Sequence, residues 1–207
     1  IGQNILKSIF FKKYTLEKIN LRINQIPDND TFCLIHLAGI AHDISKKYTH
    51  DDYININYKL TKNIFNKFLN SNAEVFIFLS SSKSVKDNYT SIITENTKPS
   101  PKTPYGLSKL KAEKYILNKL KKYNNKRIYI LRPPMIHGNG NKGNLNLLFN
   151  YLNKGFPWPL ALFKNKRSYL YIDNLNFIIN ELINNKKIKS GVYNICDSGF
   201  LSTNEII

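Results

Sequence analysis

Long apolar runs are missing from this chain of 207 residues, and methionine and tryptophan each occur only once. The longest solidly apolar stretches, such as residues 75–79, fall well short of the roughly 20 apolar residues that a membrane-spanning helix needs, so the sequence predicts no transmembrane helix. The chain also opens without a charged segment followed by an apolar stretch and a cleavage site. We therefore expect no signal peptide.

Cysteine is scarce as well, and Cys33 and Cys196 are the two in the chain. Each lies in an apolar stretch, and they are not spaced like the cysteines of a metal-binding knuckle. We expect no metal site and no disulfide framework. Two buried thiols are typical of a reducing compartment, so the predicted location is the cytoplasm.

Acidic residues number 14 against 31 basic ones, which gives a net charge of +17, yet only 4 of the basic residues are arginine. Lysine (27 residues), asparagine (29) and isoleucine (27) are abundant together, which indicates an AT-rich genome rather than a selected binding face. Proteins that read nucleic acids favour the arginine fork. The sequence therefore argues against a nucleic-acid partner. A basic RNA-binding domain stays open as a rival function, and it predicts that RNA binding depends steeply on salt concentration.

The composition is that of a globular protein, with 42% apolar and 22% charged residues, which excludes wholesale disorder. Short, continuous apolar runs at 32–38, 75–79 and 127–132 are typical of strands buried on both faces of a parallel sheet. Segments with helical periodicity, 51–70 and 105–122, separate these runs. The alternation predicts an α/β fold with a doubly wound parallel sheet.

The rhythm becomes less regular after Pro134, so we expect a first part at 1–134 and a smaller part at 135–207 that is interleaved with the last sheet strands. Both ends of the chain carry helical patterns that break off, which suggests a fragment. In the second part we expect a Gly/Asn loop at 137–144, helices near 145–153 and 174–185, and strands near 168–172 and 191–196.

The segment Tyr105-Gly-Leu-Ser-Lys109 carries the clearest chemistry. A tyrosine and a lysine four residues apart share one face of a helix, and Pro104 suits the start of that helix. An ammonium beside a phenol favours the phenolate, so Tyr105 is a candidate general acid/base for a sugar or alcohol hydroxyl. Taken alone, the spacing also fits an exposed helix with a stray tyrosine, because lysine is so abundant.

A run of three serines, Ser80 to Ser82, closes the predicted strand at 75–79. Open α/β sheets bind ligands at the carboxyl ends of their strands, so a hydroxyl at this point is a candidate site residue. The sequence places five features in one order: a strand, a serine run, the Tyr105–Lys109 helix, a further strand and then Arg132-Pro133. This order is much less common by chance than any one of its parts.

In this order the sequence resembles the extended short-chain dehydrogenases/reductases, in the branch of NAD-dependent nucleotide-sugar epimerases and dehydratases. The resemblance covers essentially the whole chain. The segments that carry it are Ile1-Gly2, Ile35 to Gly39, Ile56 to Thr61, Phe78 to Ser81, Pro104 to Glu113, Leu131 to Gly138, Gly143 to Leu145 and Arg167 to Asp173.

The resemblance implies a Rossmann-like fold, in which residues 1–134 form the dinucleotide-binding domain and residues 135–207 form part of the substrate-binding region. The catalytic residues it implies are Tyr105, Lys109 and a serine, Ser81 or Ser82. The cofactor-binding residues it implies are Gly2, Leu37, Ala38, Gly39, Asn57, Tyr105, Lys109 and Pro133. The substrate-binding residues it implies are Ser81, Tyr105, His137, Asn144, Leu145 and Arg167.

The implied cofactor is NAD, with NADP left open because no clear acidic residue ends the second strand and Arg22 lies in that region. Gly2 resembles the third glycine of the family's Gly-x-x-Gly-x-x-Gly turn, whose first strand and two earlier glycines are absent from this sequence. We therefore expect the chain as given to bind a dinucleotide poorly.

The implied activity is that of a UDP-hexose 4-epimerase working through a 4-keto sugar. A 4-keto nucleotide-sugar reductase and a non-catalytic dinucleotide-binding relative are the alternatives. Ser82 and Lys83 stand where the family's dehydratases carry an Asp-Glu pair, which argues against dehydration. The implied partners are a UDP-hexose and a second copy in a possible homodimer, while His36, inside a predicted strand, is expected in the core.

Overall fold

A computed structural model describes residues 1–18, 31–41, 47–88, 91–123, 125–139, 144–155 and 165–206. Its central sheet has four strands, all parallel, in the order β1-β2-β3-β6. The register aligns Ile35, Ile77, Tyr129 and Gly191 across the sheet. The strands are β1 (Cys33–His36), β2 (Val75–Leu79), β3 (Arg127–Arg132) and β6 (Gly191–Asn194).

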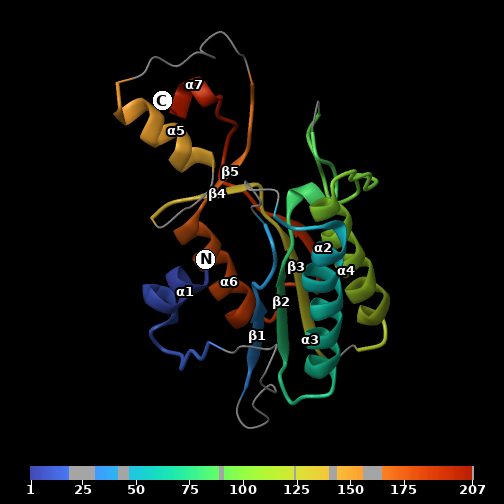
Figure 1. The fold of residues 1–207 in the computed structure, drawn as a ribbon. Coiled ribbons are helices and arrows are strands. Elements are labelled where there is room, and N and C mark those ends of the chain that lie inside the picture. Colours follow the sequence, from blue (N-terminus) through green and yellow to red (C-terminus); the bar gives the residue numbers. More distant parts are fainter. Residues whose placement is uncertain are drawn as a thin grey trace.

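Helices cover both faces of this sheet, as Figure 1 shows. One face carries a continuous helical segment and a second long helix. These are α2 (His50–Tyr53), the π-helical stretch η2 (Ile54–Lys59), α3 (Leu60–Leu69) and α4 (Pro104–Leu120). The other face carries α1 (Gly2–Lys7), the short turn η1 (Ile9–Phe11) and α6 (Ile172–Asn184). The doubly wound α/β fold is confirmed.

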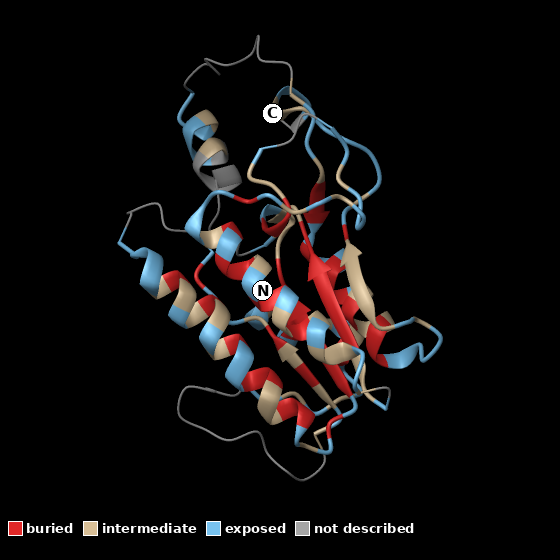
Figure 2. Cartoon of the chain, turned by 90° about the vertical axis from the view of Figure 1, so that its right-hand side faces the viewer, coloured by how far each residue is buried: buried red, intermediate tan, exposed pale blue. Residues whose placement is uncertain are grey.

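Strand β2 lies at the centre of the core and is buried along its whole length (Figure 2). Side chains of a strand point alternately to its two faces. Val75, Ile77 and Leu79 accordingly pack with α6 and η1, while Phe76 and Phe78 pack with α3 and α4. Strands covered on both faces need apolar residues at every position, which is why the continuous apolar runs located the strands.

A small parallel sheet of β4 (Met135–His137) and β5 (Tyr169–Tyr171) lies above the carboxyl ends of the main strands (Figure 1). Helices α5 (Asn144–Asn153) and α7 (Thr203–Ile206) lie above this small sheet in Figure 1. Gly138 leaves β4 with φ +127, and a Cβ there would lie 2.5 Å from Cγ2 of Ile172. Only glycine therefore allows the chain to pass so close to the start of α6.

The sequence prediction differs from this fold in several places. Strand β5 ends at Tyr171, and α6 begins at Ile172, two residues before the predicted helix. The helix expected at 51–70 contains the π-helical stretch η2, and strand β4 was not predicted. The expectation of two buried thiols is wrong, because Cys33 is half-buried and Cys196 is exposed after the end of β6.

No helix among the described residues is both long and apolar enough to cross a membrane. The division of the chain at residue 134 stays a prediction. Trp158 and the region of Arg22 lie outside the described residues.

Candidate functional site

The candidate site lies where the carboxyl ends of β1, β2 and β3 meet the start of α4 (Figure 1). Parallel strands direct their carboxyl ends to the same edge of the sheet, where open α/β folds bind ligands. The segments that follow these strands bring Gly39, Ser81 and Pro133 to this edge. Residues far apart in the sequence are thereby gathered in one place.

The start of α4 is fixed by a dense set of hydrogen bonds. Thr103 is its N-cap, and its Oγ1 accepts a hydrogen bond from the backbone N–H of Gly106 at 3.2 Å. Asp87 accepts hydrogen bonds from the N–H groups of Lys102 and Thr103 and from the Thr103 hydroxyl, at 2.6, 3.1 and 2.5 Å. Burial opposes the charge of Asp87, but these bonds outweigh it and hold the pKa of Asp87 below its usual value. The first turn of α4 is therefore held in place.

Tyr105 lies in that first turn and is half-buried. Its ring meets the ring of Tyr53 edge to face, with the centroids 6.4 Å apart. The backbone beside it, at Gly106, packs so tightly on the serine segment that a Cβ would lie 2.5 Å from the carbonyl oxygen of Lys83. The residue that follows Tyr105 in α4 therefore contacts the segment that carries the candidate serines.

Lys109 follows one turn later and is buried, with 4% of its side chain surface exposed. Its Nζ donates a hydrogen bond to the carbonyl oxygen of Leu79 at 2.9 Å and lies 4.8 Å from the ring centroid of Phe78. Burial lowers the pKa of Lys109 to about 8, although the charge of Glu113 raises it. The ammonium thus reaches from α4 to the end of β2.

Asn57 holds the loop that follows β1. Its Oδ1 accepts from the N–H of Ile40 at 2.8 Å, and its Nδ2 donates to the carbonyl of Ile40 and to Oγ of Ser108, both at 3.1 Å. The Ser108 hydroxyl in turn donates to the carbonyl of Tyr105 at 2.7 Å. Asn57 is fully buried in the π-helical stretch η2, a backbone form that is often found at functional sites. Its amide therefore orients the loop after β1 against α4.

Gly39 lies within this loop, and a Cβ at its position would be 2.9 Å from Oδ1 of Asn57 and 3.3 Å from Nζ of Lys109. The prediction grouped Gly39, Asn57 and Lys109 as cofactor-binding residues, and the structure brings them together. Ala38 and Gly39 are exposed and Leu37 is half-buried. A Cβ at Gly2, the first residue of α1, would lie 3.7 Å from Cδ1 of Leu37, so Gly2 reaches the same edge.

The two candidate serines differ in their contacts. Ser81 caps the short turn η3 (Ser82–Ser84), and its Oγ accepts from the N–H of Lys83 at 3.2 Å. The N–H of Ser82 donates to the carbonyl oxygen of Pro133 at 2.9 Å, which joins the serine segment to the end of β3. Both serines are half-buried. The choice between them stays a prediction.

Glu113 and Arg132 form a buried ion pair that sequence reasoning missed. Nη2 of Arg132 lies 2.6 Å from Oε2 of Glu113, and the two side chains are 5% and 1% exposed. Oε1 of Glu113 also accepts hydrogen bonds from the hydroxyls of Ser80 and Ser84, at 2.5 and 2.7 Å. The spacing of Glu113, four residues after Lys109, could have placed it on the site's face of the helix.

His36 lies in the core, as expected, with 2% of its surface exposed. Thr61 donates its hydroxyl hydrogen to the carbonyl of Asn57 at 2.7 Å, so Nε2 of His36 is the donor in the 2.8 Å bond between the ring and Oγ1 of Thr61. Burial and the nearby Lys109 lower the pKa of His36 to about 3. His36 is therefore neutral near pH 7.

The predicted substrate-binding residues His137, Asn144, Leu145 and Arg167 come after the candidate catalytic residues in the sequence. His137 ends β4, and its Nε2 is 3.6 Å from Oδ2 of Asp197, a partner that was not predicted. Arg167 is exposed, and its backbone pairs with that of Leu201. Asn144 and Leu145 open α5, but their side chains lie outside the described part of the chain.

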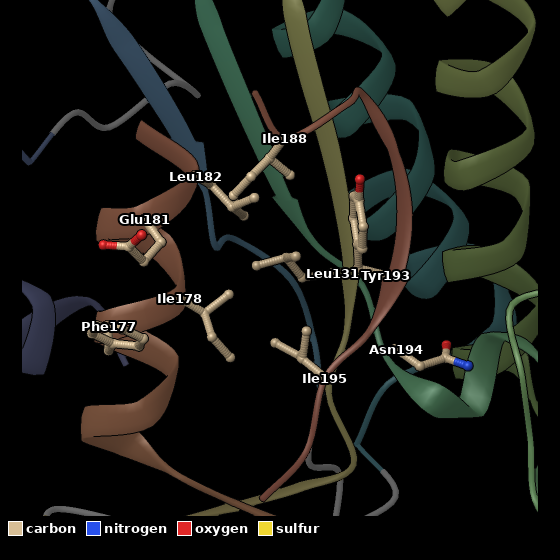
Figure 3. A pocket seen from close by; sticks show the side chains of 9 residues that line it. All are labelled: Leu131, Phe177, Ile178, Glu181, Leu182, Ile188, Tyr193, Asn194 and Ile195. Carbon is tan, nitrogen blue, oxygen red and sulfur yellow. The ribbon is translucent and has the colours of Figure 1, made fainter. Parts of the chain in front are cut away.

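A separate hollow of about 260 Å³ lies between α6 and β6. Figure 3 shows apolar side chains around it, with Glu181 and Asn194 as its polar members. None of the predicted site residues lines this hollow. Among the described residues, no three His, Cys, Asp or Glu side chains gather as metal ligands.

The fold and the candidate site define a Rossmann-like short-chain dehydrogenase/reductase of the extended type. They combine a parallel sheet between two helical layers with a Tyr-x-x-x-Lys helix and serines at a strand end. The chain belongs to the NAD dependent epimerase/dehydratase family, whose sequence profile it matches over residues 4–196. The family prediction is confirmed.

Individual relatives agree with this assignment. The chain is 29% identical over 233 aligned positions to UDP-glucose 4-epimerase of Vibrio cholerae, an alignment that covers 100% of this chain and 70% of that protein. The fold resembles RMD of Pseudomonas aeruginosa, solved with NADPH, with a TM-score of 0.74, 18% identity, and coverage of 99% of this chain and 77% of that one.

A second solved relative is UDP-glucuronic acid 4-epimerase of Bacillus cereus in complex with NAD. The TM-score is 0.70 and the identity 22%, and the match covers 95% of this chain. The chain described here spans only 58% of the length of that enzyme. At these identities the two solved structures support the fold alone.

Proposed function

We propose that this protein is an NAD-dependent nucleotide-sugar epimerase that acts at the 4-position of a UDP-hexose through a 4-keto sugar. The arrangement around α4 carries the proposal: Tyr105 stands beside the serine segment, and Lys109 reaches the ends of β1 and β2. Similarity to a UDP-glucose 4-epimerase supports the substrate class.

Each catalytic residue has one task in the proposed reaction. Tyr105 takes the proton of the sugar's 4-hydroxyl and later returns a proton to the 4-oxygen. The hydroxyl of Ser81 donates a hydrogen bond to the same oxygen and stabilises the charge that develops there, with Ser82 as the alternative donor. The Lys109 ammonium favours the phenolate form of the tyrosine.

The described residues fit a dinucleotide at this edge of the sheet. Gly39 has no room for a side chain beside Asn57 and Lys109, so its exposed backbone can approach a ligand closely. The ammonium of Lys109 lies next to that backbone and suits the ribose hydroxyls. Leu37, Ala38, Gly2 and Pro133 would line the cofactor, while Asn57 would orient the loop. NAD supplies the hydride acceptor and donor for carbon 4, with NADP as the alternative.

The sugar nucleotide is proposed to extend toward the small β4-β5 sheet. Arg167 is exposed there and is one of only 4 arginines in the chain. A guanidinium fork matches the oxygens of a diphosphate. His137 ends β4, and Asn144 and Leu145 begin α5. We propose that these three residues contact the nucleotide sugar. A homodimer that uses α4 and the helical segment before it remains part of the proposal.

Proton NMR of the sugar's anomeric signals tests the proposed activity. The full-length protein encoded by its gene is incubated with a panel of UDP-hexoses and 4-keto nucleotide sugars, with and without added reduced cofactor. A new epimer that forms without added reductant supports the epimerase. Conversion of only the keto sugars, and only with reductant, would identify a 4-keto reductase. Dinucleotide binding with no change in any sugar would indicate a non-catalytic relative.

A further inference from the structure

The carboxylate of Glu113 is saturated by four donor groups, although it is fully buried. Its Oε1 accepts from the hydroxyls of Ser80 and Ser84, at 2.5 and 2.7 Å, and from Nε of Arg132 at 3.1 Å. Its Oε2 accepts from Nη2 and Nε of Arg132, at 2.6 and 3.2 Å. One side chain of α4 thereby binds the ends of both β2 and β3.

These contacts enclose the candidate serines. Ser80 precedes Ser81 and Ser82 in the chain, Ser84 follows them, and both outer hydroxyls bond the same oxygen of Glu113. Glu113 also lies two turns from Tyr105 and one turn from Lys109 on α4, so the three share a face of the helix. A displacement of this carboxylate would move the serine segment relative to the tyrosine.

We propose that Glu113 is a positioning residue: its carboxylate, fixed by Arg132, sets the serine segment against the Tyr105–Lys109 face of α4 and keeps Lys109 protonated. This proposal rests on the proposed function for its effect on turnover. Its effects on the Lys109 charge and on the order of the serine segment do not depend on any activity.

A role in positioning explains the Glu113–Arg132 ion pair better than a contribution to folding stability does. Two charges removed from water gain little net free energy, and well-packed apolar residues of similar size often stabilise a protein as much or more. A carboxylate, however, can accept from two hydroxyls and a guanidinium at once, in a fixed geometry. An apolar pair in this place would leave the hydroxyls of Ser80 and Ser84 without these partners.

The second half of the proposal concerns the charge of Lys109. Burial lowers the pKa of Lys109 to about 8, and the negative charge of Glu113 opposes that shift. Among the described residues, His36 of β1, which is neutral near pH 7, and Asn57 of η2 also lie near Lys109, and Tyr105 shares its helix. Glu113 is the anion among these groups, and it is paired with Arg132.

Two variants separate the two effects. Glu113→Gln removes the charge and disturbs the hydrogen bonds, whereas Ser84→Ala keeps the charge and removes one bond to it. We expect kcat to fall roughly 100-fold in Glu113→Gln and roughly 10-fold in Ser84→Ala, with little change in KM, because small displacements of reacting groups are costly. The alkaline limb of the pH profile of kcat/KM should move to lower pH in Glu113→Gln and stay in place in Ser84→Ala.

Controls guard against loss of folding. Glu113→Asp keeps the charge and should retain the wild-type alkaline limb, and Glu181→Gln on α6 makes the same chemical change away from the site. Circular dichroism checks the fold of each variant. If Glu113→Gln does not fold, Glu113→Asp and Ser84→Ala still test the positioning. Unchanged kcat in a folded Ser84→Ala and Glu113→Asp would overturn it.

Two readouts need no turnover and so separate this proposal from the proposed function. The ¹³Cε signal of Lys109, assigned with Lys109→Met, should titrate at lower pH in Glu113→Gln and at the wild-type pH in Glu113→Asp. Amide hydrogen exchange at Ser84 and Val85, whose N–H groups bond Ser81 and Ser82, should be at least roughly 10-fold faster in Ser84→Ala. Wild-type protein without turnover would reject only the proposed epimerase. An unmoved Lys109 titration in Glu113→Gln, together with unchanged amide exchange in Ser84→Ala, would reject the role of Glu113.

Discussion

Gly106 of α4 packs against the carbonyl oxygen of Lys83 so closely that a Cβ atom would lie 2.5 Å from it. The same Cβ would lie 2.8 Å from Cβ of Pro101. This contact joins the short turn η3, which follows β2, to the first turn of α4. The glycine between Tyr105 and Leu107 is therefore a packing requirement of the site, and not only a feature of the motif.

Gly106→Ala should destabilise the protein, although alanine is the better helix former by about 1 kcal/mol. The added methyl group meets backbone that cannot move cheaply, and overpacking of this kind costs about 1–3 kcal/mol. Urea unfolding measures the change. Gly191→Ala is the matched control, because a Cβ at Gly191 meets nothing within 4 Å. Equal stability of the two variants would contradict the close contact.

Ser81→Ala and Ser82→Ala should differ in their effect on turnover. The serine that bonds the reacting oxygen stabilises charge in the transition state, so its loss should lower kcat by roughly 10²- to 10³-fold with a small change in KM. We expect this for Ser81→Ala and a much smaller effect for Ser82→Ala. The opposite order would assign the role to Ser82, and two small effects would remove the serine from the mechanism.

His36 should make the protein sensitive to acid between pH 6.5 and pH 3. Its pKa in the folded state is about 3, lowered by burial and by Lys109. The unfolded chain therefore takes up this proton first as the pH falls, and stability declines through that window by up to about 1.4 kcal/mol per pH unit. Denaturant unfolding at several pH values should show a shallower decline in His36→Phe. The exposed His50→Gln should keep the wild-type slope.

Arg167→Gln should raise KM for the UDP-hexose and leave kcat nearly unchanged, because contacts with a diphosphate are made equally in the ground and transition states. The neighbouring Lys166→Gln removes an exposed charge next to it and serves as the control. Equal KM values in both variants would show that general positive charge, and not this arginine, attracts the substrate.

The main features of the fold followed from the sequence because they depend on local pattern. The runs at 75–79 and 128–131 are apolar at every position, which is what a strand covered on both faces requires. Pro104 likewise marked the start of α4. The short strand β4 was missed because pairing with β5, a long-range contact, and not its own residues, makes it a strand.

The proposed catalytic residues came from the family resemblance, but the contacts that support them could not be predicted from the sequence. Glu113, Ser84 and Arg132 are ordinary polar residues in the sequence, and the register of β2, β3 and α4 decides that they meet. Asp197 reaches His137 for the same reason. Conversely, the apolar surroundings of Cys196 suggested burial, yet it lies exposed after β6 at the edge of the sheet.

The most direct test of the proposed epimerase compares Tyr105→Phe with Tyr115→Phe, which removes a hydroxyl from the same helix at a bond to Asn66. Interconversion of UDP-hexoses is followed by anomeric proton NMR, and NAD binding is measured by calorimetry. In the full-length protein encoded by the gene, we predict that Tyr105→Phe abolishes interconversion and retains NAD binding, while Tyr115→Phe retains both. Interconversion of UDP-hexoses that survives in Tyr105→Phe would contradict the role of Tyr105 as the acid/base.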